Sequence, residues 1–319
     1  MKTLILNSKE VLSLLDMKEV LPAVEEGFAA HGRGETIMPP KVYLPLEEYN
    51  GDFRAMPVSY SGGAGVKWVN AHPRNPQDHG IPSVLGVFIL SDPVTACPLA
   101  VMDATKITAY RTGASAAVAT KHLAKEGAIT LGFVGCGVQA QTALAAIREV
   151  REISGLLLYD RSEEAALKFA SAHSGRVSTL EETSGADVIV TMTPSREPLV
   201  MREWVREGAH INAMGADAPG KQELDPAILT DARIFLDDME QGSESGEVNL
   251  ALHSGVLKRD DLAGTLGEVV AGKVPGRLGA SLTVFDSTGL AVQDLAVARV
   301  LYKKAREQGI GLEIDLVGA

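Results

Sequence analysis

The clearest chemical motif in the sequence is a glycine-rich turn between an expected strand and an expected helix. Gly135, Gly137 and Ala140 form a G-x-G-x-x-A pattern directly after the apolar run Ile129–Val134. In such a turn the first glycine allows a tight bend, the second lets the backbone approach a pyrophosphate, and the small third residue lets helix pack on strand. The pattern predicts a dinucleotide site, with the helix that begins near Val138 offering its backbone N–H groups to the phosphates.

An acidic residue stands where a dinucleotide ribose needs an acceptor. Asp160 ends the next expected strand, twenty residues after Ala140. A carboxylate accepts hydrogen bonds from a ribose diol and repels a 2′-phosphate, which favours NAD over NADP. The adjoining Arg161 weakens that preference, so NADP stays an alternative. A glycine-rich turn of some other α/β fold is disfavoured because strand, helix and acid all match.

Four cations lie in otherwise apolar or strand-like runs of the first 111 residues: Lys41, Arg54, Lys67 and Arg111. Each alone has an ordinary explanation, a side chain that reaches solvent or pairs with a nearby acid. Together they predict a pocket for a small carboxylate substrate. In it an arginine supplies a bidentate fork, and a lysine whose pKa is lowered by burial supplies a movable proton.

Two loops at expected strand ends carry further candidates. Asp217 follows the strand 209–214, at the carboxyl end where open α/β sheets bind ligands, and is a candidate acid/base. A turn residue beside Gly and Pro is an equal alternative for it. Thr193 ends the preceding strand and is expected to cover the nicotinamide ribose. No metal site is expected, since His72 and His79 lie in a Pro-rich loop without ligand spacing.

The pattern of expected helices and strands, which must position these residues, changes near residue 127. The first part predicts a helix over 8–31, a mixed or mainly antiparallel sheet, and a long helix over 102–125; its strands are expected at 41–46, 53–57, 66–70 and 83–90. The second part alternates helices with short apolar strands, typical of a parallel sheet buried on both faces, at 129–134, 155–160, 187–193, 209–214, 232–237 and 282–286. A helix over 288–308 and a strand over 311–316 end the chain.

Composition and charge exclude several classes of protein. The 319 residues are 45% hydrophobic and 22% charged, which excludes a disordered, collagen-like or coiled-coil chain. The formal net charge of -11 argues against nucleic acid as a partner, and residues 116–295 alone hold 26 acidic and 16 basic residues. No secretory core or membrane-length apolar run occurs, and the two cysteines suggest no disulfide framework. We expect a soluble cytoplasmic protein with no membrane partner.

Taken together, these motifs resemble the ornithine cyclodeaminase/mu-crystallin family, and within it the archaeal-type alanine dehydrogenases. The resemblance runs end to end, through residues 38–41, 54–57, 67–73, 99–104, 111–114, 135–139, 215–221 and 285–290. It implies an α/β fold: a Rossmann-type doubly wound parallel sheet, 116–295, inserted in an α+β substrate-binding and dimerisation domain, 1–115 plus 296–319. The family's fold also implies a homodimer formed through the sheet of that domain.

The resemblance also assigns roles to matched positions. It implies that Lys67 is the active-site lysine, Asp217 the acid/base and Arg111 the ligand of the substrate carboxylate, helped by Lys41 or Arg54. The positions that it places near NAD are Thr112, Val138, Gln139, Asp160, Met214 and Ser287.

The implied function is NAD-dependent oxidative deamination of a small L-amino acid, alanine to pyruvate and ammonia, and the reverse reductive amination of the 2-oxo acid. Cyclodeaminases typically carry glutamate where this chain has Arg54, and a cation there disfavours the distal ammonium of ornithine by roughly 1 kcal/mol in a wet site. Three alternatives stay open: an ornithine cyclodeaminase, a cyclic-imine reductase, and a mu-crystallin-like protein that binds NAD(P)H and a hydrophobic ligand without fast turnover.

Overall fold

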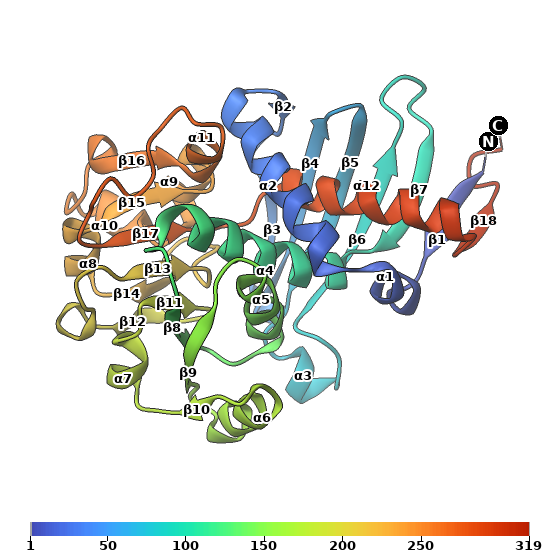
Figure 1. Ribbon diagram of the computed structural model, residues 1–319. Helices are drawn as coiled ribbons and strands as arrows, with labels where there is room; N and C mark the ends of the chain where they lie inside the picture. The colour runs from blue at the N-terminus through green and yellow to red at the C-terminus, as the bar shows by residue number, and fades with distance from the viewer. Residues whose placement is uncertain (1, 319) are drawn as a thin grey trace. The chain divides into compact units, whose positions relative to one another are not determined.

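The computed structural model describes residues 2–318, which divide into two compact units (Figure 1). One unit comprises the chain up to Arg111 together with the chain from Leu290 onward, and the other comprises Thr112–Gly289. Their bounds lie four and six residues before those expected at 115/116 and 295/296. The first bound falls inside the continuous helix α4 (Ala104–Leu123), so no helix-breaking residue marks it in the sequence.

The first unit is built on an eight-stranded sheet with the order β18-β1-β7-β6-β5-β4-β2, and β3 pairs with β4 at its side. Its strands are β1 (Thr3–Leu6), β2 (Thr36–Ile37), β3 (Val42–Leu46), β4 (Gly51–Tyr60), β5 (Gly63–Ala71), β6 (Val84–Ser91), β7 (Pro98–Asp103) and β18 (Leu312–Ile314). All neighbours are antiparallel except β1 and β7, which confirms a mainly antiparallel sheet. The pairing of β18 with β1 brings the two ends of the chain together.

The helices of this unit are α1 (Ser8–Leu14), α2 (Met17–Arg33), the short α3 (Asn75–Asp78) and α12 (Ala291–Gln308), with a 3-10 turn at Glu47–Tyr49. In Figure 1, α12 runs across the sheet beside α2, and it packs on β4, β5 and β6.

Two helix predictions need correction. The single helix expected over 8–31 is wrong: it is two helices, because Leu15 is extended and the Asp16 side chain accepts a hydrogen bond from Lys18 N and caps α2. The long helix starts at Ala104 rather than 102, because β7 continues to Asp103, whose carboxylate accepts from the first-turn N–H groups of Thr105 and Lys106.

The two faces of this sheet differ. Alternate residues of neighbouring strands form a buried row, registered across the sheet as Leu6, Met102, Phe88, Lys67 and Met56. On the opposite face, apolar side chains are between 38% and 72% exposed: Ile37, Val42, Leu44, Trp68, Val87 and Ile89. The first face therefore holds a lysine among core residues, while the second is an apolar surface.

The second unit contains an entirely parallel eight-stranded sheet of order β10-β9-β8-β11-β13-β17-β15-β16, which confirms the predicted doubly wound fold class. Its strands are β8 (Ile129–Val134), β9 (Ile153–Tyr159), β10 (Arg176–Val177), β11 (Val188–Thr191), β13 (His210–Ala213), β15 (Arg233–Leu236), β16 (Leu262–Thr265) and β17 (Thr283–Asp286). A separate parallel pair joins β12 (Arg196–Val200) to β14 (Gln222–Leu224). The strand order reverses between β8 and β11, the switch point where such sheets bind ligands.

Short helices follow most of these strands. They are α5 (Val138–Arg148), α6 (Glu163–His173), α7 (Leu180–Ser184), α8 (Pro226–Asp231), α9 (Met239–Ser245), α10 (Asn249–His253) and α11 (Leu266–Val270), with 3-10 turns at Arg202–Trp204 and Arg259–Asp261. The last helix of the chain begins at Ala291 instead of 288, because Thr288 and Gly289 instead bind the buried carboxylate of Asp237.

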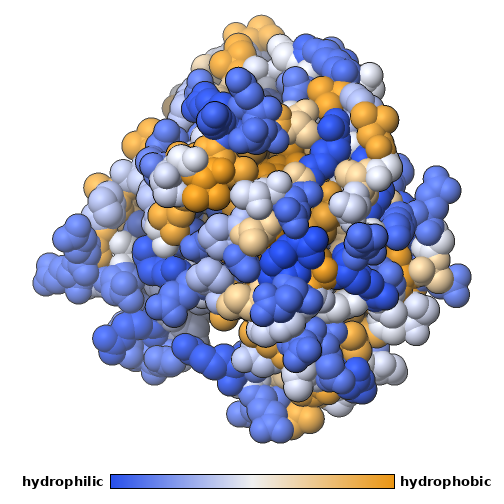
Figure 2. Space-filling model, turned by 90° about the vertical axis from the view of Figure 1, so that its left-hand side faces the viewer, coloured by the Kyte–Doolittle hydropathy of each residue, from blue (hydrophilic) through white to orange (hydrophobic). Residues whose placement is uncertain are grey.

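Surface chemistry is mixed on the face that Figure 2 presents, where hydrophilic residues lie between the hydrophobic ones. Across residues 2–318, no helix combines the length and apolar character needed to span a bilayer.

Gly113 sets the approach of α4 to α5. A Cβ atom at this position would lie 2.5 Å from the backbone carbonyl carbon of Thr142. Backbone cannot move aside as a side chain can, so we expect Gly113→Ala to lower the free energy of unfolding by about 1–3 kcal/mol in urea titrations. Gly155→Ala is the control, because its Cβ meets only the Thr130 methyl group at 3.4 Å. Equal stabilities for the two variants would contradict this account of the helix contact.

Candidate active site

Lys67 is a buried amine in an apolar setting. It lies in the middle of β5, is 1% exposed, and is flanked across the sheet by Met56 and Phe88, which are also buried. Its Nζ atom lies 3.4 Å from the hydroxyl of Thr108, to which it donates a weak hydrogen bond. A core strand position with apolar neighbours therefore holds an ionisable group instead of a hydrophobic side chain.

A buried carboxylate lies beside Lys67. Asp294, in the first turn of α12, is fully buried, and its Oδ2 atom lies 2.7 Å from Lys67 Nζ. Its Oδ1 atom accepts a hydrogen bond from Nε of Arg111 at 3.3 Å. The next residue back, Gln293, accepts from Arg111 through its side-chain oxygen at 3.2 Å. Two of the cations expected from the sequence, Lys67 and Arg111, thus contact side chains of the first turn of α12.

The pKa of Lys67 is lowered from 10.5 to about 7, chiefly because burial penalises the charged amine. The negative charge of Asp294 acts against this shift, while the positive charges of Arg111 and Lys41 add to it. An amine with a pKa near 7 is present in both protonation states at neutral pH, which suits a group that takes and returns a proton.

Arg54 and Lys41, the other two cations expected at the substrate, differ from Lys67 and Arg111 in their surroundings. Arg54 is 8% exposed and its guanidinium makes a bidentate pair with Asp52, with two N–O distances of 2.9 Å. It also lies over the Tyr43 ring, 5.2 Å from its centroid. Asp52 offsets the charge of Arg54, so Arg54 repels the distal ammonium of ornithine less than the sequence suggests. Lys41, which is partly exposed, is then the main source of that repulsion.

The glycine-rich turn of the second unit has the shape that a dinucleotide needs. Gly135 has φ +102°, and a Cβ atom there would lie 2.8 Å from the Met192 carbonyl oxygen. A Cβ at Gly137 would meet nothing within 4 Å, so the space above this residue is open. Gly137 caps α5 without a side-chain hydrogen bond, and Val138 is 68% exposed. The first-turn N–H groups are thus left for an anion such as a pyrophosphate, and the residues fit the group.

The other residues expected at the dinucleotide lie in or beside this turn, at neighbouring strand ends or, for Thr112, in α4. Asp160 directly follows β9 and its carboxylate accepts from Cys136 N and Ser162 N, both at 2.8 Å, which ties it to the glycine turn. Around them, Arg161 is exposed and Gln139 half-buried, while Ala140 and Thr112 are buried in α5 and α4. Burial and the Asp160 charge raise the pKa of the Cys136 thiol to about 12, so this cysteine stays neutral.

Buried carboxylates hold the loops at the strand ends. Glu223, fully buried, accepts from the hydroxyls of Thr191 and Thr193, from Thr193 N, and from Gly215 N, which follows the buried Met214. Ser287 donates to Asp237 at 3.3 Å. The hydroxyls of Thr193 and Ser287 are therefore engaged by protein carboxylates, and their loops are fixed.

Asp217 lies in the loop between β13 and β14, is about one third exposed, and pairs with Lys221 at 2.5 Å. It sits beyond the carboxyl end of β13, as expected from the sequence. A lysine four residues along keeps the Asp217 carboxylate next to a proton donor.

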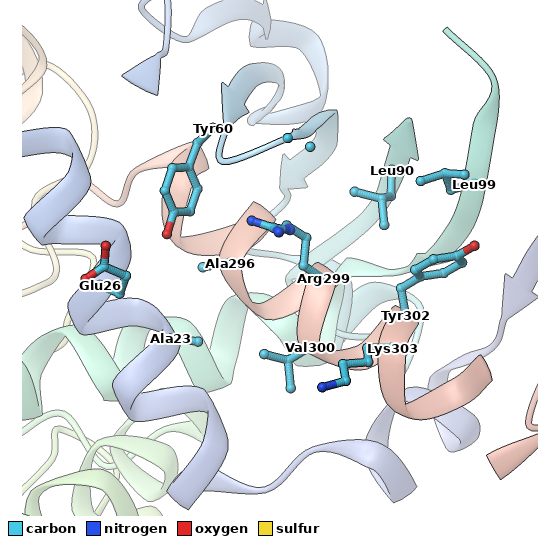
Figure 3. Close-up of a pocket in the computed structure, with 12 residues that line it drawn as sticks. Ala23, Glu26, Tyr60, Leu90, Leu99, Ala296, Arg299, Val300, Tyr302 and Lys303 are labelled. Atoms are coloured by element: carbon cyan, nitrogen blue, oxygen red, sulfur yellow. The ribbon is translucent and has the colours of Figure 1, made fainter. Parts of the chain in front are cut away.

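A cavity of about 470 Å³ lies elsewhere in the first unit, between α2, α12 and the sheet (Figure 3). In Figure 3 the Arg299 side chain extends from α12 toward Tyr60, and its guanidinium lies 5.9 Å from the ring centroid. Arg299 and Lys303 are roughly 140° and 180° around the helix from Asp294, so this cavity opens on the other side of α12. Within residues 2–318, no group of three or more His, Cys, Asp or Glu side chains could hold a metal ion.

Sequence reasoning missed Asp294, Gln293, Glu223 and Asp237. A signal existed for Asp294: apart from Gln293 the run 290–298 is apolar, so an acid within it is expected to be buried and to need a partner. Glu223 lies in a stretch whose polarity resembles that of an ordinary loop, Asp237 ends an expected apolar strand, and only the fold shows that both are buried.

Comparison with known proteins shows the family of the chain. The sequence profile of the ornithine cyclodeaminase/mu-crystallin family matches residues 1–309. An alanine dehydrogenase of Archaeoglobus fulgidus is 51% identical over 320 residues, covering 98% of each chain. The structure of an archaeal alanine dehydrogenase dimer with bound NAD has a TM-score of 0.96 at 50% identity, covering 99% of this chain and 100% of that one. A Thermococcus litoralis Δ1-pyrroline-2-carboxylate reductase with NADH and L-proline has a TM-score of 0.94 at 34% identity, covering 98% and 100%.

Asp286, at the end of β17, gives the second unit a pH-dependent stability. Burial raises its pKa from 3.8 to about 8, so the folded state holds a proton that the unfolded state releases above pH 3.8. Its contribution to the free energy of unfolding is thus complete below that pH and is lost as the pH rises to about 8.

We expect Asp286→Asn, which is neutral at every pH, to unfold at a higher temperature than the wild type at pH 8 and to match it more closely at pH 5. Thermal unfolding at both pH values measures this, with the exposed Asp260→Asn as control. A pH dependence unchanged by Asp286→Asn would show that Asp286 is ionised in the fold.

Proposed function

Since the chain belongs to the ornithine cyclodeaminase/mu-crystallin family, we propose that it deaminates a small L-amino acid oxidatively with NAD, alanine before others, and catalyses the reverse amination. The proposal takes its substrate from the alanine dehydrogenase that is 51% identical over almost the whole chain. The glycine turn and Asp160 support NAD as the cofactor.

The observation that carries the proposal is the buried contact of Lys67 with Arg111 through Asp294. An amino acid presents a carboxylate and an α-ammonium two bonds apart. A guanidinium recognises the carboxylate, and an amine with a pKa near 7 can take a proton from the ammonium. Both groups occur here within one buried cluster.

Deprotonation comes first in this reaction, because the α-amine must be neutral before the Cα–H bond can break. Lys67 in its neutral form accepts that proton, with Asp217 as the alternative acceptor. Arg111 holds the carboxylate, with Lys41 adding positive charge nearby. NAD, when bound, supplies the acceptor for the hydride from Cα.

Hydrolysis follows. The oxidised substrate is an iminium, which water attacks at Cα, and Asp217 takes one proton of that water as general base. Asp217 returns this proton to the amine nitrogen of the adduct and takes the hydroxyl proton as the carbonyl forms, so the Cα–N bond breaks, ammonia leaves and the 2-oxo acid remains. Lys221, paired with Asp217, lies beside this base during the step.

Reduction of a cyclic imine is the second candidate, supported by the 34% identity to a Δ1-pyrroline-2-carboxylate reductase. The same groups serve it, since protonated Lys67 can give a proton to the imine nitrogen while Arg111 holds the carboxylate. Ornithine cyclodeamination is less favoured, because the distal ammonium of ornithine would meet the positive charges of Lys41, Lys67 and Arg111.

A homodimer formed through the first unit is part of the proposal. The apolar sheet face of Ile37, Val42, Leu44, Trp68, Val87 and Ile89 is exposed, and the rings of Trp68 and Phe53 stack on it with centroids 5.2 Å apart. Exposed aromatic and aliphatic side chains on one face are typical of a subunit interface. The similar archaeal alanine dehydrogenase is a dimer.

The two cysteines, Cys97 and Cys136, are both free, which suits a reducing compartment. We therefore assign the reaction to the cytoplasm, where free amino acids and NAD meet.

The catalytic assignments are tested by Lys67→Ala and Asp217→Asn. We expect each to lower kcat for NADH formation from L-alanine by about 100- to 10,000-fold, since each removes a group that moves a proton. NADH binding, followed by fluorescence, should stay unchanged. The exposed Lys303→Ala and Asp260→Asn are the matched controls. Turnover near the wild-type rate in either test variant refutes the role given to that residue.

The dimer surface is tested by Trp68→Glu. A charge at the centre of the apolar face should yield monomers in size-exclusion chromatography with light scattering, because its burial at an interface is unfavourable. Leu167→Glu is the control, since Leu167 is 53% exposed on α6 and belongs to the second unit. A dimeric Trp68→Glu protein places the interface elsewhere.

A further inference from the structure

We propose that Asp294 is the positioning residue of the active site, a shared counter-ion that holds the amine of Lys67 and the guanidinium of Arg111 at a fixed separation. This inference rests on the proposed function and deepens it, because the separation of the two cations sets which substrates place a carboxylate on one and an α-amine on the other.

The geometry of the carboxylate carries the proposal. Its two oxygens are divided between the cations, Oδ2 at 2.7 Å from Lys67 Nζ and Oδ1 at 3.3 Å from Arg111 Nε. The side chains are 0%, 1% and 9% exposed for Asp294, Lys67 and Arg111, so water does not screen these contacts. Lys67 comes from β5, Arg111 from α4 and Asp294 from α12, and the carboxylate therefore links three elements.

The Lys67 contact leaves proton-transfer directions open. The Nζ–Oδ2 distance of 2.7 Å is that of an ion pair, and Asp294 is also a hydrogen-bond partner of the amine. The protonated amine has three N–H bonds, and with Asp294 and Thr108 as acceptors at least one of them remains available to a substrate nitrogen. Attraction that depends on distance more than on direction holds the amine in place while its hydrogens remain usable by a substrate nitrogen.

Gln293 supports the same arrangement. Its side-chain oxygen accepts from Arg111 Nη1 and from Leu290 N, both at 3.2 Å, which fixes the orientation of the amide. Its Nε2 group is buried and has no partner among residues 2–318. A buried donor beside Arg111 fits a second hydrogen bond to a substrate oxygen.

Charge balance explains why one carboxylate is needed. Lys41, Lys67 and Arg111 all carry positive charge near this point, while Arg54 on the same sheet face is paired with Asp52. With Asp294 the cluster keeps a net positive charge, which attracts an anionic substrate. Without it, like charges would meet in a buried site, Lys67 would lose its proton more readily, and Arg111 would lose one of its anchors.

Two variants of the full-length protein separate positioning from a merely structural role. Asp294→Asn removes the charge, so the acidic limb of the kcat/KM profile for L-alanine should move to lower pH by about one unit or more. We expect kcat/KM at pH 7 to fall about 100-fold through misplaced Arg111. Asp294→Glu keeps the charge, so its acidic limb should stay near that of the wild type while KM for alanine rises about tenfold.

A second readout does not depend on turnover. In protein labelled with ¹³C at lysine Cε, the Lys67 resonance, assigned by its loss in Lys67→Arg, should titrate near pH 7 in the wild type and at lower pH in Asp294→Asn. If wild-type protein makes no NADH from alanine, the proposed function fails and this titration still tests the pairing. Glu307→Gln, at an exposed position of the same helix, is the control. The affinity for NADH should be unchanged in Asp294→Asn, Asp294→Glu and Glu307→Gln.

Several results overturn the proposal. One is a Lys67 titration midpoint that Asp294→Asn leaves unchanged. Another is an acidic limb of the kcat/KM profile that moves by the same amount in Asp294→Glu and Asp294→Asn. Such a shift would come from disturbed packing and not from the loss of the Asp294 charge. If Asp294→Asn does not fold, an unchanged KM in Asp294→Glu overturns it as well.

Discussion

The burial of one amine is the constraint on which the first unit depends. Lys67 occupies a core position in a row with Leu6, Met56, Phe88 and Met102, where a charged group is unfavourable unless it is paired. The pairing carboxylate comes from α12, a helix that lies more than 220 residues later in the chain. The return of the chain to the first unit at Leu290 is therefore needed chemically as well as for packing, because it delivers Asp294 to Lys67.

Buried carboxylates play a related part in the second unit. Glu223 and Asp237 accept hydrogen bonds from loops that follow β11, β13 and β17, the strand ends at which a doubly wound sheet binds its ligand. Loops at such a site carry many backbone N–H groups without partners in a sheet. A carboxylate accepts several of them at once, so one side chain fixes the path of two loops. Rigid strand ends of this kind can present a cofactor to a substrate with little motion.

Local rules in the sequence predict the parts that depend on neighbouring residues. The apolar run 129–134 with Gly135 and Gly137 predicts β8 and its turn, because strand, glycines and helix follow one another directly. The same rules fail at Asp16, where a single capping side chain divides one helical pattern into two helices. They also overlook β7, whose residues continue into the helical composition of α4.

Nonlocal contacts explain why the site was predicted only in part. Lys67 and Arg111 stand out as cations in apolar runs, but their common partner cannot be read from either run. Asp294 is the one acid in an apolar helix turn, and only the packing of α12 on β5 shows which cation it meets. Arg54 was expected to face the substrate, yet its guanidinium donates two hydrogen bonds to Asp52, two residues away on β4.

The most direct measurement follows the hydrogen that the reaction must move. L-alanine carrying deuterium at Cα is incubated with the protein and NAD, and NADH, pyruvate and ammonia are quantified by mass spectrometry and colorimetry. The account predicts one deuterium in NADH for each pyruvate and each ammonia formed. NADH without deuterium, or no NADH while the protein still binds the cofactor, would contradict it.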